Sequence, residues 1–469
     1  MLGKIIFILP HLCVYEAPLR EATDVRFHPS EFYAMTSPTF RKAQLLLLSL
    51  ATFTACLGAT RFQSGPADLL NEAIILTPQA GSDREDMEIA QWQKKSRATD
   101  ARPVDFERLG WAYVAKARRT LDAGYYKLAE KTADVMDAKF APSAESRLLR
   151  GHVFHNLHRF AEAETLARAL VAERGMAADY ALLCDALMEQ GKLTAAVAAC
   201  QKLVDLRPGV EAYSRIAHLR WLKGDLTGAT VMMETAGRAA SPRDPESRAW
   251  LLARLSGYYL QGGDAARALA VAESAISAAS AYPPALLARG RALLFFGKNT
   301  DAISVLQRAA DLNPLPEYQW WLADAQRAAG EEADAVKTEQ AIKARGETGD
   351  PRTLALFLAT RGDASDEAVR LAREELANRA DVLTHDALAW ALAAKGDLAG
   401  AQAESTLASA EHTRDARLLW HAGEIALAAG DRAKAAQAFA AARPLAATLT
   451  PSERTRLTQR LANTVAVLR

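Results

Sequence analysis

The chain has 469 residues and a formal net charge of +1 at pH 7, with 57 Lys and Arg residues against 56 Asp and Glu residues. Hydrophobic residues make up 50% of it, which excludes a chain that is disordered over most of its length. The balanced charge argues against a nucleic-acid partner, because phosphate binding needs an excess of basic side chains on one face. The length predicts several compact domains or one elongated array of repeats.

Residues 1–34 show no sustained hydrophobic period. We interpret this segment as an over-extended N-terminus, or a non-structural extension, in front of a start at Met35. The alternative is an authentic extension whose apolar run, Ile5–Leu9, forms a second apolar patch.

The stretch Arg41–Ala59 reads RKAQLLLLSLATFTACLGA. Two cations, a short apolar run and small residues follow one another in the order that is typical of a secretory signal peptide. The apolar run from Ala43 to about Phe53 has roughly half of the ~20 residues that a helix needs to cross a bilayer. Its length therefore disfavours a transmembrane helix, and a buried or anchoring helix is the lesser alternative.

The end of this stretch, Phe53-Thr54-Ala55-Cys56, resembles the lipobox of bacterial lipoproteins, although Phe53 stands where a Leu is usual. The resemblance implies that residues 35–56 are a signal peptide with a lipobox and that Cys56 carries the lipid. It also implies a cell-envelope protein that is lipid-anchored on the periplasmic side of a bacterial membrane. A plain signal peptide would leave the protein periplasmic, and an unprocessed one would leave it cytoplasmic.

Two segments flank the main body of the chain. We expect residues 57–102 to hold a tether of mixed composition and then an N-terminal capping helix within Ser82–Arg97, where Ile89 and Trp92 lie at helical spacing. We expect residues 446–469 to form a C-terminal capping helix. The sequence Thr-Pro-Ser-Glu at 450–453 is typical of a helix start.

Residues 103–445 repeat one pattern about ten times. The segments 182–208 and 286–314 align without a gap from their turn glycine to their closing proline. The turn position recurs every 32 to 39 residues, at Gly124, His158, Gly191, Gly224, Gly263, Gly297, Gly330, Gly362, Gly396 and Gly430. An alanine follows the turn after five or six residues, at Ala163, Ala196, Ala229, Ala268, Ala302, Ala335, Ala368, Ala401 and Ala435.

This pattern resembles the tetratricopeptide repeat (TPR), a helix–turn–helix unit of about 34 residues. The resemblance implies an all-α fold, a right-handed superhelical solenoid of about ten units. Alanine lets two helices approach closely, and glycine permits the backbone geometry that ends the first helix. Aspartate often follows the glycine, where it can cap the second helix, at Asp225, Asp264, Asp363, Asp397 and Asp431.

Four cysteines occur, at positions 13, 56, 184 and 200, and no two are spaced as Cys-x-x-Cys. Cys184 and Cys200 would face each other across one helical hairpin. A disulfide there is conceivable in an oxidising compartment if the α-carbons lie within about 7 Å. We favour two buried free thiols.

No nucleophile elbow, Walker loop, dinucleotide fingerprint or His-Glu-x-x-His helix appears, so we expect no enzyme and no cofactor. His152, His155 and His158 are spaced three apart, but the spacing drifts around the helix and no carboxylate completes a metal site. We therefore favour ordinary histidines and expect no metal. For each of the tryptophans Trp320, Trp390 and Trp420, we favour a filler between helices over an anchor for a partner.

In the repeat family, residues six and three before the turn glycine face the concave groove. The resemblance therefore implies a partner-binding groove made of His152, His155, Asp185, Met188, His218, Trp221, Arg291, Leu294, Asp324, Arg327, Trp390 and Glu424. The leading hypothesis is a non-catalytic, membrane-tethered scaffold that binds a protein or peptide in the cell envelope. The alternatives are an accessory subunit of an envelope enzyme complex and a cytosolic adaptor whose signal is not processed.

Overall fold

The computed structural model describes residues 66–467. This part of the chain forms 23 α-helices and one short 3-10 helix, and it contains no strand. The expected all-α helical-repeat solenoid is therefore confirmed. Met35, Cys56 and the signal peptide predicted at 35–56 lie outside the described residues. Between residues 66 and 467, no helix is both long enough and apolar enough to cross a membrane.

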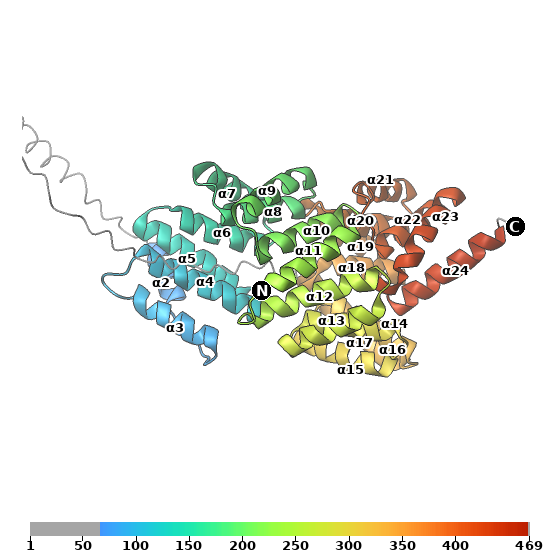
Figure 1. The fold of residues 1–469 in the computed structure, drawn as a ribbon, viewed down its shortest axis with the longest axis horizontal. Helices are drawn as coiled ribbons and strands as arrows, with labels where there is room; N and C mark the ends of the chain where they lie inside the picture. Colours follow the sequence, from blue (N-terminus) through green and yellow to red (C-terminus); the bar gives the residue numbers. More distant parts are fainter. Residues whose placement is uncertain (1–65, 468–469) are drawn as a thin grey trace, which may run out of the picture.

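Ten antiparallel helix pairs make up the body, and each pair packs against the next (Figure 1). The helices of these pairs are α4 (Pro103–Thr120), α5 (Gly124–Phe140), α6 (Ala144–Asn156), α7 (Phe160–Glu173), α8 (Ala177–Glu189), α9 (Leu193–Leu206), α10 (Val210–Leu222), α11 (Leu226–Ala239), α12 (Pro245–Gln261), α13 (Ala265–Ala278), α14 (Pro283–Phe295), α15 (Asn299–Leu312), α16 (Pro316–Ala328), α17 (Glu332–Gly349), α18 (Pro351–Arg361), α19 (Ser365–Asn378), α20 (Val382–Lys395), α21 (Leu398–Ala408), α22 (Ala416–Ala428) and α23 (Arg432–Ala442).

The small residues of the repeat lie at the helix crossings and in the turns, as the pattern predicts. All nine alanines that follow the turns are at most 2% exposed, because they lie where the two helices of a pair cross. Nine of the ten turn positions have a positive φ, and His158 takes the glycine's place with φ 61°. Since an L-residue rarely adopts this conformation, glycine is the default residue there.

Two turns differ from the expectation. In the first pair, Leu121 rather than Gly124 has the left-handed conformation, because α4 ends at Thr120, four residues before Gly124, and α5 begins at Gly124. In the eighth pair, Ala364 stands directly before α19 with φ 48° and makes no side-chain cap. Asp363 is thereby displaced from the cap position, and its carboxylate pairs with Lys343 instead. The other four predicted aspartates cap their helices as expected.

The N-terminal flank is more structured than a tether followed by one helix. Residues 66–75, which we expected to belong to the tether, form α2 (Pro66–Ile75), and α2 packs against α5. The next helix, α3 (Arg84–Ser96), begins at a capping box made by Asp83 and Asp86. The Gln93 side chain donates to the carbonyl of Ile75 over 3.0 Å, so this bond ties the two flanking helices together.

The C-terminal flank starts against the first helices of several units, because η1 (Arg443–Thr448) contacts α12, α14 and α22. It continues with α24 (Pro451–Val467), which packs against α16 as well as α23. Arg454 donates to the carbonyl of Leu294 over 3.3 Å, and Arg456 donates to that of Thr360 over 3.1 Å. The last helix thus bonds to the backbone of units far earlier in the chain.

The solenoid also closes upon itself, because segments near turns that are 153 to 189 residues apart in sequence touch. The turn at Gly191 lies against the carbonyl of Ala380. Lys223 pairs with Glu411 over 2.6 Å. The Gln261 side chain donates to the carbonyl of Arg414.

Candidate functional site

An interior cavity of about 380 Å³ lies on the axis of the solenoid. The first helices of eight successive units, α8 to α22, contribute to its wall, and so does Thr448 of η1. This arrangement follows from the repeat, since the first helix of every unit faces inward and the second faces outward. The burial pattern agrees, because α8, α16 and α18 are buried on nearly all sides.

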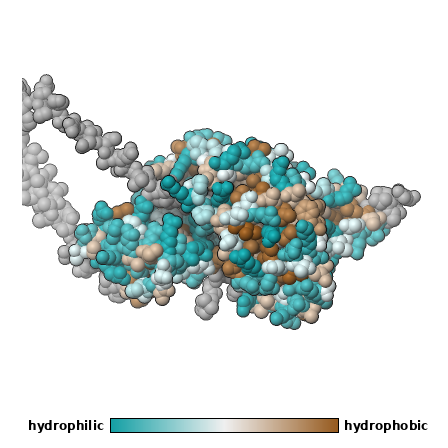
Figure 2. Space-filling model, turned by 60° about the horizontal axis from the view of Figure 1, so that its bottom comes forward, coloured by the Kyte–Doolittle hydropathy of each residue, from teal (hydrophilic) through white to brown (hydrophobic). Residues whose placement is uncertain are grey.

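Aromatic side chains form much of the cavity wall, namely Trp221, Trp250, Tyr258, Tyr318, Trp320 and Trp321. Trp221 stacks on His218 at a centroid distance of 5.5 Å, and its indole N–H donates to Gln261 over 2.8 Å. Figure 2 shows that apolar residues also gather on the surface in the middle of the molecule, while both ends are mostly hydrophilic.

Five arginines line the same cavity, and they fall into two groups. Arg352 and Arg379 both pair with Asp381, at 3.2 and 3.1 Å. Arg417 pairs with Glu453 at 2.8 Å. Among the described residues, neither Arg254 nor Arg291 makes an ion pair.

The two arginines without an ion pair lie over aromatic rings. Arg254 lies over the ring of Tyr258, and its Nη2 is 3.4 Å from Nδ1 of His218. Burial, followed by the charge of Arg254, lowers the pKa of His218 to about 3, so this imidazole is uncharged at neutral pH. Arg291 lies over the ring of Trp321 and donates to the carbonyl of Thr448 over 3.3 Å. Burial lowers the pKa of Arg291.

Of the predicted groove residues, Met188, His218, Trp221 and Arg291 line this cavity together. None of the twelve is fully exposed. Seven are buried (His152, His155, Asp185, Met188, Trp221, Leu294 and Asp324), and five are half-buried (His218, Arg291, Arg327, Trp390 and Glu424).

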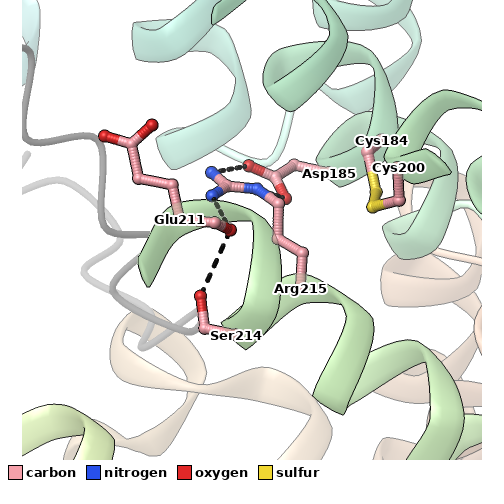
Figure 3. Close-up of a disulfide and its surroundings, with 6 residues drawn as sticks. All are labelled: Cys184, Asp185, Cys200, Glu211, Ser214 and Arg215. Atoms are coloured by element: carbon pink, nitrogen blue, oxygen red, sulfur yellow. Dashed lines mark hydrogen bonds and ion pairs between the residues drawn. A yellow bond between two sulfur atoms is a disulfide. The ribbon is translucent and has the colours of Figure 1, made fainter. Parts of the chain in front are cut away.

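The remaining charged groove residues are engaged within the chain. Asp185 forms a bidentate pair with Arg215, with N–O distances of 2.8 and 2.7 Å (Figure 3). Asp324 accepts from Arg361 over 2.7 Å. Similar internal pairs join Arg327 to Glu339 and Glu424 to Arg460.

The aromatic groove residues divide between the cavity and the packing of helices. Trp390 stacks on His421 at 4.2 Å and donates to Thr360 over 3.0 Å. Trp320 and Trp420 are 2% and 1% exposed, so both fill space between helices, although Trp320 also reaches the cavity wall.

The three histidines spaced three apart serve packing. His152 lies 5.2 Å from the ring of Trp111, and His155 and His158 both lie against Phe160. Burial lowers the pKa of His152 to about 3. Between residues 66 and 467, no group of three or more His, Cys, Asp and Glu side chains is placed to hold a metal ion.

The two cysteines of the third unit are bonded, which corrects our preference for free thiols. Cys184 of α8 and Cys200 of α9 form a disulfide, with their α-carbons 5.4 Å apart (Figure 3). Both positions lie at the crossing of the two helices, where small side chains let the backbones approach. That approach brings the α-carbons within the range a disulfide needs.

The sequence analysis missed most of the cavity wall. Arg254 and Trp250 lie one and two turns before the groove positions of α12, and Arg352 lies at the start of α18. A signal was present, because these residues continue the inward face at helical spacing. The family rule of two groove positions per unit left them out.

The fold and the cavity define the class of this molecule as an all-α helical-repeat solenoid that encloses a small interior site. Two segments, residues 148–211 and 287–350, match the family model of the tetratricopeptide repeat. This match supports a tetratricopeptide-repeat protein. No curated protein matches the chain.

Among solved structures, a tetratricopeptide repeat protein from Parabacteroides merdae is 21% identical over 54% of this chain and 98% of its own, with a TM-score of 0.31. Yeast Tom70 is 13% identical over 82% of this chain and 93% of its own, with a TM-score of 0.36. Human IFIT1, solved as a dimer with PPP-AAAA, is 11% identical over 81% of this chain and 99% of its own, with a TM-score of 0.44.

Proposed function

We propose that this protein is a non-catalytic scaffold that binds a protein or peptide partner through the inner face of its solenoid. One observation carries the proposal: four residues predicted for the groove, from three different units, converge on one cavity. Repeat solenoids use such inner faces as binding surfaces. The aromatic wall supplies anchoring contacts of the kind that dominate binding energy at interfaces.

The volume of the cavity limits what can enter it. About 380 Å³ accommodates one or two side chains and excludes a folded domain. A partner therefore inserts an anchoring side chain into the cavity and lays the rest of its segment along the neighbouring surface.

A cavity-filling substitution tests this mode of binding without removing an existing contact. Ala288 lines the cavity and is 8% exposed, so Ala288→Phe places a ring in the space that the partner would use. Ala310, which is 7% exposed and does not line the cavity, provides the matched control Ala310→Phe. We expect affinity capture from envelope extracts to lose partners with the first variant and keep them with the second. Equal recovery with both variants, at equal thermal stability, contradicts binding at the cavity.

We further propose that the scaffold is attached to a membrane through a lipid on Cys56, which the lipobox resemblance supports. Metabolic labelling with radioactive palmitate should mark the wild-type protein and not the Cys56→Ser variant. Unchanged labelling of that variant, or no labelling of the wild type in a lipoprotein-processing host, contradicts the anchor. In either case the partner-capture experiment stands on its own.

A further inference from the structure

Two of the five arginines in the cavity wall lack an ion-pair partner within the part of the chain that the structure describes. The other three each have a carboxylate at ion-pair distance, whereas Arg254 and Arg291 have none among the described residues. Burying a charge without a partner is costly in a protein interior. These two guanidinium groups are therefore the cations of the site that have no carboxylate in contact.

The described part of the cavity wall also carries six carboxylates, but none of them lies within ion-pair distance of Arg254 or Arg291. Asp386 accepts from His421 over 2.9 Å, while Asp350 and Asp415 cap α18 and α22 through backbone N–H groups. Glu189 pairs with Arg379. Burial lowers the pKa of Arg291, whereas Glu317 and Asp415 raise it through their charge, without contact.

Four buried N–H groups in the wall also lack a hydrogen-bond acceptor within the described residues. They are Nε1 of Trp320 and Nε of Arg254, Arg291 and Arg379, of which only Arg379 has carboxylates beside it. A buried donor that is left unsatisfied is unfavourable, more so when it is charged, so a group that accepts hydrogen bonds here stabilises the site.

The side chains around these donors determine what kind of ligand fits the cavity. Trp221, Trp250 and Trp321 offer flat apolar faces, and the volume of about 380 Å³ suits a body of one or two rings. We propose that the cavity binds a small free organic anion, a carboxylate carried on an aromatic or similarly apolar body, with Arg254 and Arg291 holding the carboxylate.

Arginine suits this task because its planar guanidinium matches a carboxylate with two parallel hydrogen bonds. Arg291 already donates to the carbonyl of Thr448, which places η1 at the edge of the site. The inference goes beyond the scaffold role, since it assigns the inner cavity to a small molecule.

Isothermal titration calorimetry tests the inference with defined probes. The probes are phenylacetate, 3-phenylpropanoate and indole-3-acetate, each beside its uncharged amide. We expect at least one acid to bind about ten-fold or more tighter than its amide, because a hydrogen bond to a charged group is worth that factor. Arg254→Gln and Arg291→Gln should each weaken that acid by about ten-fold or more.

Arg248→Gln is the matched control, since Arg248 is exposed and lies on the same helix as Arg254. It should leave binding unchanged. The inference is overturned if no acid binds, if acid and amide bind equally, or if the two inward variants bind like the control. It is also overturned if only an acidic peptide with blocked ends binds, a result that would leave the scaffold proposal intact.

Thermal unfolding of the ligand-free variants gives a second readout. Replacing an unpaired buried cation by an isosteric apolar side chain removes an uncompensated charge. Arg254→Met and Arg291→Met should therefore leave the Tm unchanged or raise it. A fall in Tm of several degrees for both variants would show that the two arginines are structural, which contradicts a ligand role.

Discussion

The contact between distant turns can be isolated by comparing two glycines with the same backbone conformation. Gly191 and Gly297 both have φ 69°. A Cβ added at Gly297 meets nothing within 4 Å. A Cβ added at Gly191 comes well inside 3.0 Å of the carbonyl oxygen of Ala380, a separation that real Cβ atoms essentially never show.

The two substitutions to alanine share one cost and differ in another. The left-handed conformation costs an L-residue about 1–2 kcal/mol, and this cost is the same at both sites. Gly191→Ala must also push the two turns apart, and overpacking of this kind costs about 1–3 kcal/mol more. We therefore expect Gly191→Ala to be less stable than Gly297→Ala by about 1–3 kcal/mol.

Equilibrium unfolding in urea, followed by circular dichroism, measures this difference from the midpoints of the two variants. Gly224→Ala should resemble Gly191→Ala, because its added Cβ meets the carbonyl of His412. Substitutions without a specific cost usually differ in their free energy of unfolding by no more than about 0.5 kcal/mol. If the three variants agree within that range, the turns are not in contact and the closed form of the solenoid is refuted.

Three further outcomes follow from buried groups. Asp185→Asn should lower the free energy of unfolding by about 3–5 kcal/mol, because it leaves Arg215 charged and buried. In urea unfolding, the double variant with Arg215→Met should recover most of that loss. If the effects of the two substitutions simply add, the ion pair is contradicted. His218 has a folded pKa of about 3, below its unfolded value of about 6.5, so its contribution is present above pH 6.5 and is lost as the pH falls. When the pH falls from 7.5 to 5.5, the wild type should therefore lose about 1.3 kcal/mol more of its free energy of unfolding than His218→Gln. If the stability of both proteins has the same pH dependence, His218 is not buried in its neutral form. Alkylation of the unfolded protein without reductant should leave Cys184 and Cys200 unlabelled, and labelling of both residues would exclude the disulfide. Reduction should lower the free energy of unfolding by about 3 kcal/mol, given the sequence separation of 16 residues.

The local architecture could be predicted from the sequence because the residues that define each unit lie within about 34 residues of one another. A small residue at the crossing, a turn residue with positive φ and an aspartate cap are short-range requirements. His158 illustrates their strength, since its place in the register predicted a turn although the residue is not glycine. Leu121 and Ala364 show the limit. Leu121 takes the left-handed conformation in place of Gly124, and Ala364 takes it in addition to Gly362.

The candidate site could be predicted only in part. The family rule placed His218, Trp221 and Arg291 on the inner face, and they do meet at the cavity. It could not show that Asp185, Asp324 and Glu424 are engaged by the chain itself. Their partners depend on the twist between units, which accumulates over many repeats. The sequence of a single repeat does not contain this twist.

The disulfide and α2 escaped prediction for different reasons. Cys184 and Cys200 lie at ordinary crossing positions, and the sequence does not give the separation of the two helix axes. The apolar positions of α2 become buried only when α5 is present to cover them, as Ile75 shows with 0% exposure.

The course of α24 changes how this array should come apart. In an open repeat array each unit contacts only its neighbours, so the terminal units fray first and stability grows with each unit added. Here Arg454 and Arg456 bond to the backbone at Leu294 and Thr360, in the middle of the array. Fraying from the C-terminus must therefore uncover central units at the same moment. Deleting the last helix is expected to broaden or split a transition that the whole chain makes as a single cooperative step.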